Sequence, residues 1–187
     1  MHTSSSFTED TKTRRDVDFE KETIVVQTIA SSEKEALYKL KTALAKVVTI
    51  DTKSVQENDP LEKKLAKIKK PNSVAVGKVK AEPILSTVVF EKKPTRKRVI
   101  NYVNKKVQKN KIKAGKSKKV KHAKVYSISV KMPKNAMLKR SKIYYSEVKK
   151  QASRQKLPIP LVFAIMHSES SFNPRARSHI PAYGLMQ

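Results

Sequence analysis

The chain has 187 residues, of which 38% are hydrophobic and 31% charged, and its formal net charge is +26. This length accommodates one ordinary domain or two small ones, and the apolar fraction is sufficient for a packed core. The absence of cysteine excludes disulfides, thiolate metal sites and cysteine nucleophiles. The longest uninterrupted apolar run, at 161–166, is far shorter than the roughly 18 residues that a membrane-spanning helix needs, so no transmembrane span is predicted.

Positive charge is concentrated between residues 61 and 124, where 22 lysines and arginines accompany three acids. Such a segment attracts polyanions, whether nucleic acid, an anionic membrane surface or an anionic cell-wall polymer. Lysine outnumbers arginine 34 to 8, and no Tyr or Phe is interleaved with the cluster at 113–124, which disfavours a specific nucleic-acid site. A solvated basic face or a flexible loop fits these features better, and the charge alone does not select a partner.

The first 50 residues predict a tail, two strands and a helix. Residues 1–16 are polar without a hydrophobic period, which indicates a disordered tail. Apolar residues alternate in places over 17–29, around a turn-like 20–22, and this favours two short strands. Ser32 followed by Glu35 forms a capping box, after which apolar residues recur at helical spacing and indicate packing surface rather than a cofactor site.

Residues 51–132 continue a mixed pattern. The polar stretch 51–72 allows a short helix near 61–68, and the β-branched run 84–90 favours a buried strand. A basic helix is expected around 99–107, and alternation over 125–132 predicts a further strand. We therefore expect a basic α+β amino-terminal domain over 17–132.

The last part of the sequence predicts helices. Pro133, Lys134 and Asn135 read as a linker, with Asn135 placed to cap a helix. A second helix is expected after Pro158, with Pro160 at its first position and its end near Ser170. The apolar stripe of the first of these helices consists of Met137, Tyr144, Tyr145, Val148 and Ala152.

Only two acids follow residue 91, Glu147 and Glu169. Glu147 lies beside two lysines and is expected to be solvated. Glu169 continues the stripe of Ile165 and Met166 into the last turn of its helix, where the dipole disfavours negative charge. Both effects favour a protonated carboxyl group, which could donate a proton to a leaving group. The alternative is a glutamate at a frayed helix end, pointing into water, and His167 reads as an ordinary surface or packed histidine.

The segment around Glu169 resembles the catalytic segment of the soluble lytic transglycosylases, the goose-lysozyme-like murein hydrolases. The shared pattern is an Ile-x-x-x-Glu-Ser helix end, then Ser-Phe-Asn-Pro, a serine nine positions after the glutamate, and Gly-Leu-Met-Gln. Residues 124–133 and 150–155 are similar to the membrane-bound murein transglycosylase C subgroup, and 17–29 more loosely so. In this chain the pattern is carried by Ile165, Glu169, Ser170, Ser171, Phe172, Asn173, Pro174, Ser178, Gly184, Leu185, Met186 and Gln187.

The resemblance implies that 136–187 form the amino-terminal part of an incomplete, all-α, lysozyme-like catalytic domain. It implies cleavage of the β-1,4 bond between N-acetylmuramic acid and N-acetylglucosamine in peptidoglycan glycan strands, leaving a 1,6-anhydro end. Glu169 matches the single acid/base residue, and Phe172 matches a packing position. No cofactor and no metal are expected. The substrate-binding positions that the resemblance gives are Ser178, Gly184, Met186 and Gln187.

The chain also departs from that family. Residues 157–160 replace the usual glycine and aspartate-type cap before the catalytic helix, and Pro181 stands where glycine or a polar residue is common. The later cleft motif, a signal peptide and a lipid-anchoring cysteine are absent from the sequence. We expect a piece truncated at both ends, with little activity of its own, from a protein of the cell envelope or periplasm. The alternative function is a basic polyanion- or cell-wall-binding module without catalytic activity.

Overall fold

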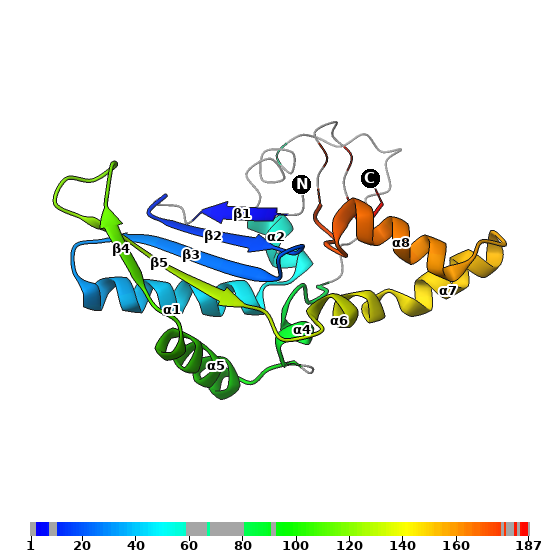
Figure 1. Ribbon diagram of the computed structural model, residues 1–187, viewed down its shortest axis with the longest axis horizontal. Helices are drawn as coiled ribbons and strands as arrows, with labels where there is room; N and C mark the ends of the chain where they lie inside the picture. Colours follow the sequence, from blue (N-terminus) through cyan, green and yellow to red (C-terminus); the bar gives the residue numbers. More distant parts are fainter. Residues whose placement is uncertain are drawn as a thin grey trace.

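One antiparallel sheet and its covering helices make up most of the computed structural model, which describes residues 3–7, 11–58, 67, 81–90, 93–176, 178, 182 and 184–186 (Figure 1). The strand order is β1-β2-β3-β5-β4. The strands are β1 Thr3–Phe7, β2 Thr13–Asp18, β3 Thr23–Ala30, β4 Lys113–Lys116 and β5 Lys124–Lys131, and the helices are α1 Glu33–Thr49, α2 Thr52–Asn58, α4 Ser86–Phe90, α5 Arg96–Lys109, α6 Ala136–Ile143, α7 Tyr145–Arg154 and α8 Ile159–Ser170.

The centre of the sheet is β3, which pairs with β2 on one side and β5 on the other. Every second residue of β3 is buried, and Ile24 and Val26 lie opposite Val130 and Ile128 of β5. Because side chains alternate across a strand, these residues form one apolar face. Helix α1 packs on that face and α5 packs on α1, so the main core lies between the sheet and α1 (Figure 1).

Helix α1 begins with the predicted capping box. The Ser32 hydroxyl oxygen accepts a hydrogen bond from the Glu35 backbone N–H at 3.2 Å. The Glu35 carboxylate in turn accepts one from the Ser31 backbone N–H at 2.9 Å. These bonds satisfy amide groups that a helix start leaves unpaired. The apolar stripe that follows is buried, with Leu40 and Leu44 fully enclosed, which confirms its role as packing surface.

The predicted disordered tail at 1–16 is wrong where the structure describes it. Residues of β1 pair with β2, and β2 begins at Thr13 and pairs with β3, so the sheet starts well before residue 17. The helix-facing side of β2 is formed by Thr13, Arg15 and Val17, opposite Thr28, Val26 and Ile24. A threonine and an arginine on that face conceal the alternation in the sequence, and neighbouring strands supply the hydrogen bonds that stabilise it.

The apolar run 84–90 is also a correction, because it forms the short helix α4 rather than a strand. The Leu85 carbonyl accepts hydrogen bonds from the backbone N–H groups of Val88 and Val89, at 3.1 and 2.9 Å. Short apolar runs do not distinguish a buried strand from a buried helical turn by periodicity. The helix predicted near 61–68 lies outside the described residues except for position 67.

The carboxyl-terminal part is helical, as predicted, but the expected first helix is two helices. Helix α6 ends at Ile143 and α7 begins at Tyr145, and the backbone N–H of Tyr144 between them donates to the Ser141 carbonyl at 3.1 Å. Helix α8 starts after Pro158 and ends at Ser170, the predicted position. Sheet and helices together agree with the expected α+β domain followed by helices. Within the described residues, no helix has the length and apolarity that crossing a membrane requires.

Tyr102 on α5 is the clearest unpaired polar group of the main core. Its ring packs edge-on against Phe90, with centroids 5.2 Å apart, and its buried hydroxyl has no hydrogen-bond partner among the described residues. Burial raises the pKa of Tyr102 from 10.0 to about 12. The folded state therefore retains the phenolic proton more tightly than the unfolded state. This contribution to stability is complete below about pH 10 and is lost as the pH rises to about 12.

We predict that Tyr102→Phe raises the free energy of unfolding by about 1 kcal/mol at neutral pH, because the variant no longer buries an unpaired hydroxyl. Its stability should also fall less steeply between pH 10 and 12 than that of the wild type. Urea unfolding at several pH values measures both effects. Tyr38→Phe is the matched control, because the Tyr38 side chain is exposed. A loss of stability in Tyr102→Phe at neutral pH would contradict this interpretation.

Candidate active site

Glu169 lies in the last turn of α8 and is half-buried. Within the part of the chain that the structure describes, its carboxylate has neither a hydrogen-bond partner nor an ion-pair partner. The expected apolar stripe beside it is only partly enclosed: Met166 is buried, whereas Ile165 is exposed. The carboxylate is therefore both sheltered on one side and accessible, an arrangement that a proton donor to an external substrate needs.

The chain turns sharply immediately after this helix. Ser171 and Phe172 both adopt positive φ values, of 49° and 58°. The left-handed region is costly for residues other than glycine and is tolerated where surrounding contacts hold it. The turn is closed by hydrogen bonds from the Asn173 N–H to the Ser170 carbonyl at 2.9 Å and from the Ala176 N–H to the Asn173 carbonyl at 3.1 Å.

Aromatic contacts fix the turn to the two preceding helices. The Phe172 side chain is buried, and its ring lies 6.1 Å from that of Phe163 and 5.9 Å from that of His167. Phe163 also stacks on Tyr145 of α7 at 6.2 Å. Phe172 therefore packs, as the resemblance implies, and His167 is an exposed residue whose ring contacts Phe172. This second, smaller core stabilises the end of α8.

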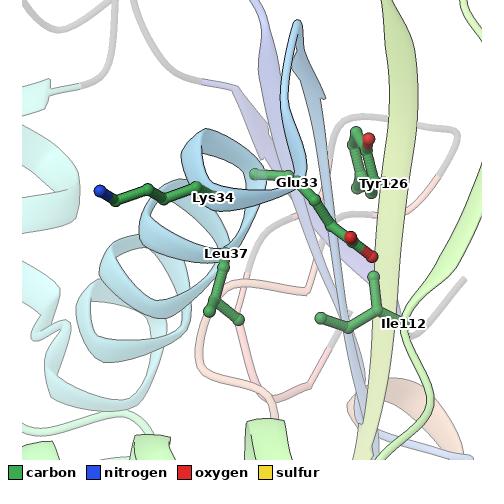
Figure 2. Close-up of a pocket in the computed structure, with 6 residues that line it drawn as sticks. Glu33, Lys34, Leu37, Ile112 and Tyr126 are labelled. Atoms are coloured by element: carbon green, nitrogen blue, oxygen red, sulfur yellow. The ribbon is translucent and has the colours of Figure 1, made fainter.

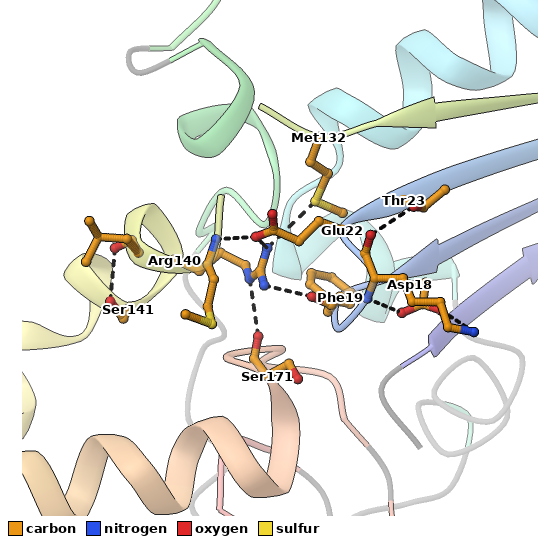
Figure 3. A network of polar contacts seen from close by, with 11 residues as sticks. Asp18, Phe19, Glu22, Thr23, Met132, Arg140, Ser141 and Ser171 are labelled. Atoms are coloured by element: carbon orange, nitrogen blue, oxygen red, sulfur yellow. Dashed lines mark hydrogen bonds and ion pairs between the residues drawn. The ribbon is translucent and has the colours of Figure 1, made fainter. Parts of the chain in front are cut away.

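Arg140 on α6 connects this turn to the sheet, as Figure 3 shows. Among the described residues it is the largest fully buried side chain, with 1% of its surface exposed. Its Nε donates to the Ser171 carbonyl at 3.2 Å, and its Nη2 donates to the Phe19 carbonyl at 2.8 Å. The guanidinium also lies over the Phe19 ring, 5.4 Å from the centroid, and Nη1 is 3.7 Å from the Met132 sulfur. One side chain thus links α6, the turn at 19–22, the end of β5 and the end of α8.

Glu22, in the turn between β2 and β3, provides the negative charge for this guanidinium. Its Oε1 lies 3.7 Å from Arg140 Nη1 and accepts a hydrogen bond from the Met137 backbone N–H at 2.5 Å. Burial lowers the pKa of Arg140, and the Glu22 carboxylate opposes that effect. The predicted cap at Asn135 is wrong, because Asn135 is left-handed and its side chain makes no capping bond. Glu22 instead satisfies the start of α6 from a distant part of the sequence.

Tyr144 lies one helical turn after Arg140 and is half-buried. Burial, and to a smaller extent the Glu82 carboxylate, raise the pKa of Tyr144 to about 12, while the Arg140 cation opposes them. Its hydroxyl therefore remains protonated across the neutral range. Tyr144 also packs against the small core formed by Val148, Met166 and Phe172.

The other predicted site residues follow the turn. The Ser178 N–H donates to the Ala182 carbonyl at 3.1 Å, and the Ser178 hydroxyl oxygen accepts from the Ala182 N–H at 3.2 Å. The Gly184 N–H donates to the Ala176 carbonyl at 3.0 Å, and its φ of 111° favours glycine. Met186 is exposed, and Gln187 lies outside the described residues. Ser178 and Gly184 thus make hydrogen bonds within the protein, while the sugar-binding roles stay predictions.

A separate hollow of about 320 Å³ lies at the start of α1, at the opposite end of β3 from Arg140. Figure 2 shows Leu37, Ile112 and Tyr126 around it, with Lys34 extending away from Tyr126. Its lining is mostly apolar and does not include Glu169. Glu33 is the one carboxylate in its lining, so the hollow is separate from the site that contains Glu169.

Sequence reasoning missed Arg140 and Glu22. A signal was present for Arg140, because it lies between Met137 and Tyr144 at helical spacing, on the stripe predicted to be apolar. A charged residue on such a stripe indicates a buried partner. Nothing in the sequence identified that partner, because Glu22 and Phe19 lie more than 100 positions away.

Comparison with known proteins matches the segment that contains Glu169 to a known family. Residues 146–187 match the family described as the transglycosylase SLT domain. Similar curated proteins are each named "Membrane-bound lytic murein transglycosylase C": that of Klebsiella pneumoniae subsp. pneumoniae is 38% identical over 63 residues, and that of Sodalis glossinidius 36% identical over 63 residues. Each match covers 34% of this chain and 18% of the relative, so the matched segment spans less than a fifth of either relative. The resemblance to lytic murein transglycosylases predicted from the sequence is confirmed, and the matched domain segment includes Glu169.

Proposed function

We propose that this chain carries the acid/base carboxyl group, Glu169, of a peptidoglycan lytic transglycosylase. One observation carries the proposal: within the segment that matches the transglycosylase SLT domain, the half-buried carboxylate at the end of α8 has no polar partner among the described residues. A carboxyl group that is not engaged by its own protein is available to a ligand. The relatives' names point to murein as the ligand of this type of domain.

The proposed reaction needs one carboxyl group. Protonated Glu169 donates its proton to the glycosidic oxygen as the bond from that oxygen to the muramoyl anomeric carbon breaks. The 6-hydroxyl oxygen of the same muramoyl residue then bonds to the anomeric carbon, and its proton passes to the Glu169 carboxylate. The products are a shortened glycan and a 1,6-anhydro-muramoyl end, and the carboxyl group returns to its starting state. No water is consumed.

An internal nucleophile removes the need for the second carboxylate that most glycosidases use. The only other acid after residue 91 is Glu147, which is exposed on α7 and accepts a hydrogen bond from Gln151 Nε2 at 2.7 Å. Its location and its occupied oxygen make it a poor partner for Glu169. Glu147 is therefore not proposed as a second catalytic carboxylate.

The finer assignments belong to the same proposal. Residues 136–187 would form the first part of a lysozyme-like catalytic domain, joined to the α+β domain before it. Ser178, Gly184, Met186 and Gln187 would contact the glycan, with Gly184 allowing a close approach of its backbone. The substrate would be peptidoglycan strands in the cell envelope, where the relatives' names place membrane-bound murein enzymes.

We predict that Glu169→Gln abolishes release of 1,6-anhydro-muropeptides, because an amide cannot donate the proton that the leaving oxygen requires. The measurement is mass spectrometry of purified peptidoglycan digested with the longest form of the protein that contains these residues. Glu147→Gln is the matched control and should retain wild-type activity. Reducing-end products from the wild type would instead indicate a lysozyme-type hydrolase, and activity that survives Glu169→Gln would contradict the assignment.

A second candidate function, binding of a polyanion without catalysis, is favoured by the exposed cations around β4. Seven lysines there are exposed, and none has an acidic partner within 4.0 Å in the described parts of the chain. On nearby α5, burial lowers the pKa of Lys106, and the Lys109 and Lys105 ammonium groups lower it further. The cations of α5 thus repel one another, and an anionic ligand would relieve that repulsion. The seven are Lys111, Lys113, Lys116, Lys118, Lys119, Lys121 and Lys124.

For this candidate we predict that Lys116, Lys118, Lys119 and Lys121 changed together to Gln weaken binding to anionic cell-wall polymer and flatten its salt dependence. The reason is that each neutralised anionic group contributes to the salt dependence of binding. Fluorescence titration at several salt concentrations measures the change. Replacing Lys139, Lys142, Lys149 and Lys150 with Gln changes the net charge equally and serves as the control. Equal loss in both variants would mean that only the total charge matters, which contradicts a binding site at β4.

A further inference from the structure

We infer that Arg140 is a positioning residue that holds the end of α8, and with it Glu169, against the turn at 19–22 of the sheet. The inference rests on the proposed function of Glu169. It assigns to the amino-terminal sheet a part in the chemistry, beyond that of a neighbouring module.

Arg140 contacts the end of α8 directly. Arg140 Nε donates to the carbonyl oxygen of Ser171, which is the C-cap residue of α8 and is 3% exposed. Glu169 is two residues earlier on the same helical turn. A buried carbonyl needs a hydrogen-bond partner, and Arg140 is the donor that the structure gives it. The position of the guanidinium therefore determines the position of the helix end.

The guanidinium of Arg140 is itself held by contacts with the sheet. Nη2 donates to the Phe19 carbonyl at 2.8 Å, and Glu22 lies 3.7 Å from Nη1. The Met132 backbone N–H also donates to the Glu22 carbonyl at 2.8 Å, which joins the turn at 19–22 to the end of β5. Arginine is a planar fork with donors in fixed directions, so two anchored nitrogens leave the third little freedom. Arg140 thus holds the end of α8 at a fixed position relative to the sheet.

The turn that Arg140 holds has an unfavourable backbone conformation. Ser171 and Phe172 are both left-handed, a backbone conformation that is unfavourable for residues other than glycine. Without the bond to the Ser171 carbonyl, the helix end could relax toward a less strained conformation. Such a relaxation displaces the carboxyl group of Glu169, and a misplacement of about 1 Å costs about 100-fold in rate.

Arginine and lysine differ in the hydrogen bonds that they can make at position 140. A lysine at 140 keeps the positive charge that Glu22 faces, but its single nitrogen cannot bond the Ser171 and Phe19 carbonyls in the fork geometry. Arg140→Lys therefore retains the ion pair and breaks the bridge. This substitution separates the positioning role from the simple presence of a cation.

The test compares Arg140→Lys with Arg154→Lys in the longest form of the protein that contains these residues. Arg154 is an exposed residue of α7 and provides a matched control. With a soluble peptidoglycan glycan as substrate, Arg140→Lys should lower kcat by about 10- to 100-fold with little change in KM. Amide hydrogen exchange at Asn173 and Ala176, whose N–H groups close the turn, should become faster. Arg154→Lys should alter neither quantity.

The two readouts distinguish the failure of this inference from that of the proposed function. An unchanged kcat in folded Arg140→Lys, or a rise in KM alone, would overturn the positioning role. If the wild type cleaves no glycan, the proposed function fails and hydrogen exchange alone decides the inference. Unchanged exchange at Asn173 and Ala176 would then overturn it, whereas faster exchange in Arg140→Lys alone would support it.

Discussion

The buried guanidinium of Arg140 is the interaction on which the geometry of the candidate site depends. A charge with 1% exposure is costly unless its donors are used and a counterion is near. Here Ser171, Phe19 and Glu22 meet those needs, and they come from the end of α8 and from the turn at 19–22. Separating Arg140 from these partners would leave buried polar groups unpaired. The end of α8, the turn at 19–22 and α6 therefore keep fixed positions relative to one another. Glu169 lies in the last turn of α8 and is therefore held in place with it.

This arrangement connects the two parts of the chain that the sequence presents as separate. The sheet and α1 form the large core, whereas α7, α8 and the turn after them form a small one. A small core alone rarely supplies much stability. Placing Arg140 and Glu22 between the two parts ties the small core to the large one. A catalytic group also gains precision when it is supported by a rigid scaffold, which the sheet provides.

The sequence predicted best the features that short segments determine by themselves. The capping box at Ser32, the strand β5 and the end of α8 at Ser170 depend on neighbouring residues, and all three agree with the structure. Two strands around the turn at 20–22 were predicted, but the start of β2 was missed because its helix-facing side carries Thr13 and Arg15. The run 84–90 was assigned to a strand because short apolar runs fit either class.

The candidate site likewise contains residues that a local pattern identifies and residues that it does not. Glu169 could be found from its place in a local pattern, whereas Arg140 and Glu22 act only through partners far away in the chain. The Asn135 cap was predicted because the sequence offered a local capping residue, but the hydrogen bond at the start of α6 is made by Glu22, which is distant in the sequence. Contacts of this kind depend on the completed fold, so local periodicity cannot reveal them.

The most direct test of the central claim is a crystal structure of the Glu169→Gln variant with a peptidoglycan glycan bound. The account predicts that a glycosidic oxygen between muramoyl and glucosaminyl residues lies within about 3 Å of the side chain at 169. It also predicts that the Arg140 contacts to the Ser171 and Phe19 carbonyls persist. A glycan bound at a distance from α8, for instance along the lysines of β4, would contradict the assignment of Glu169 as the acid/base group.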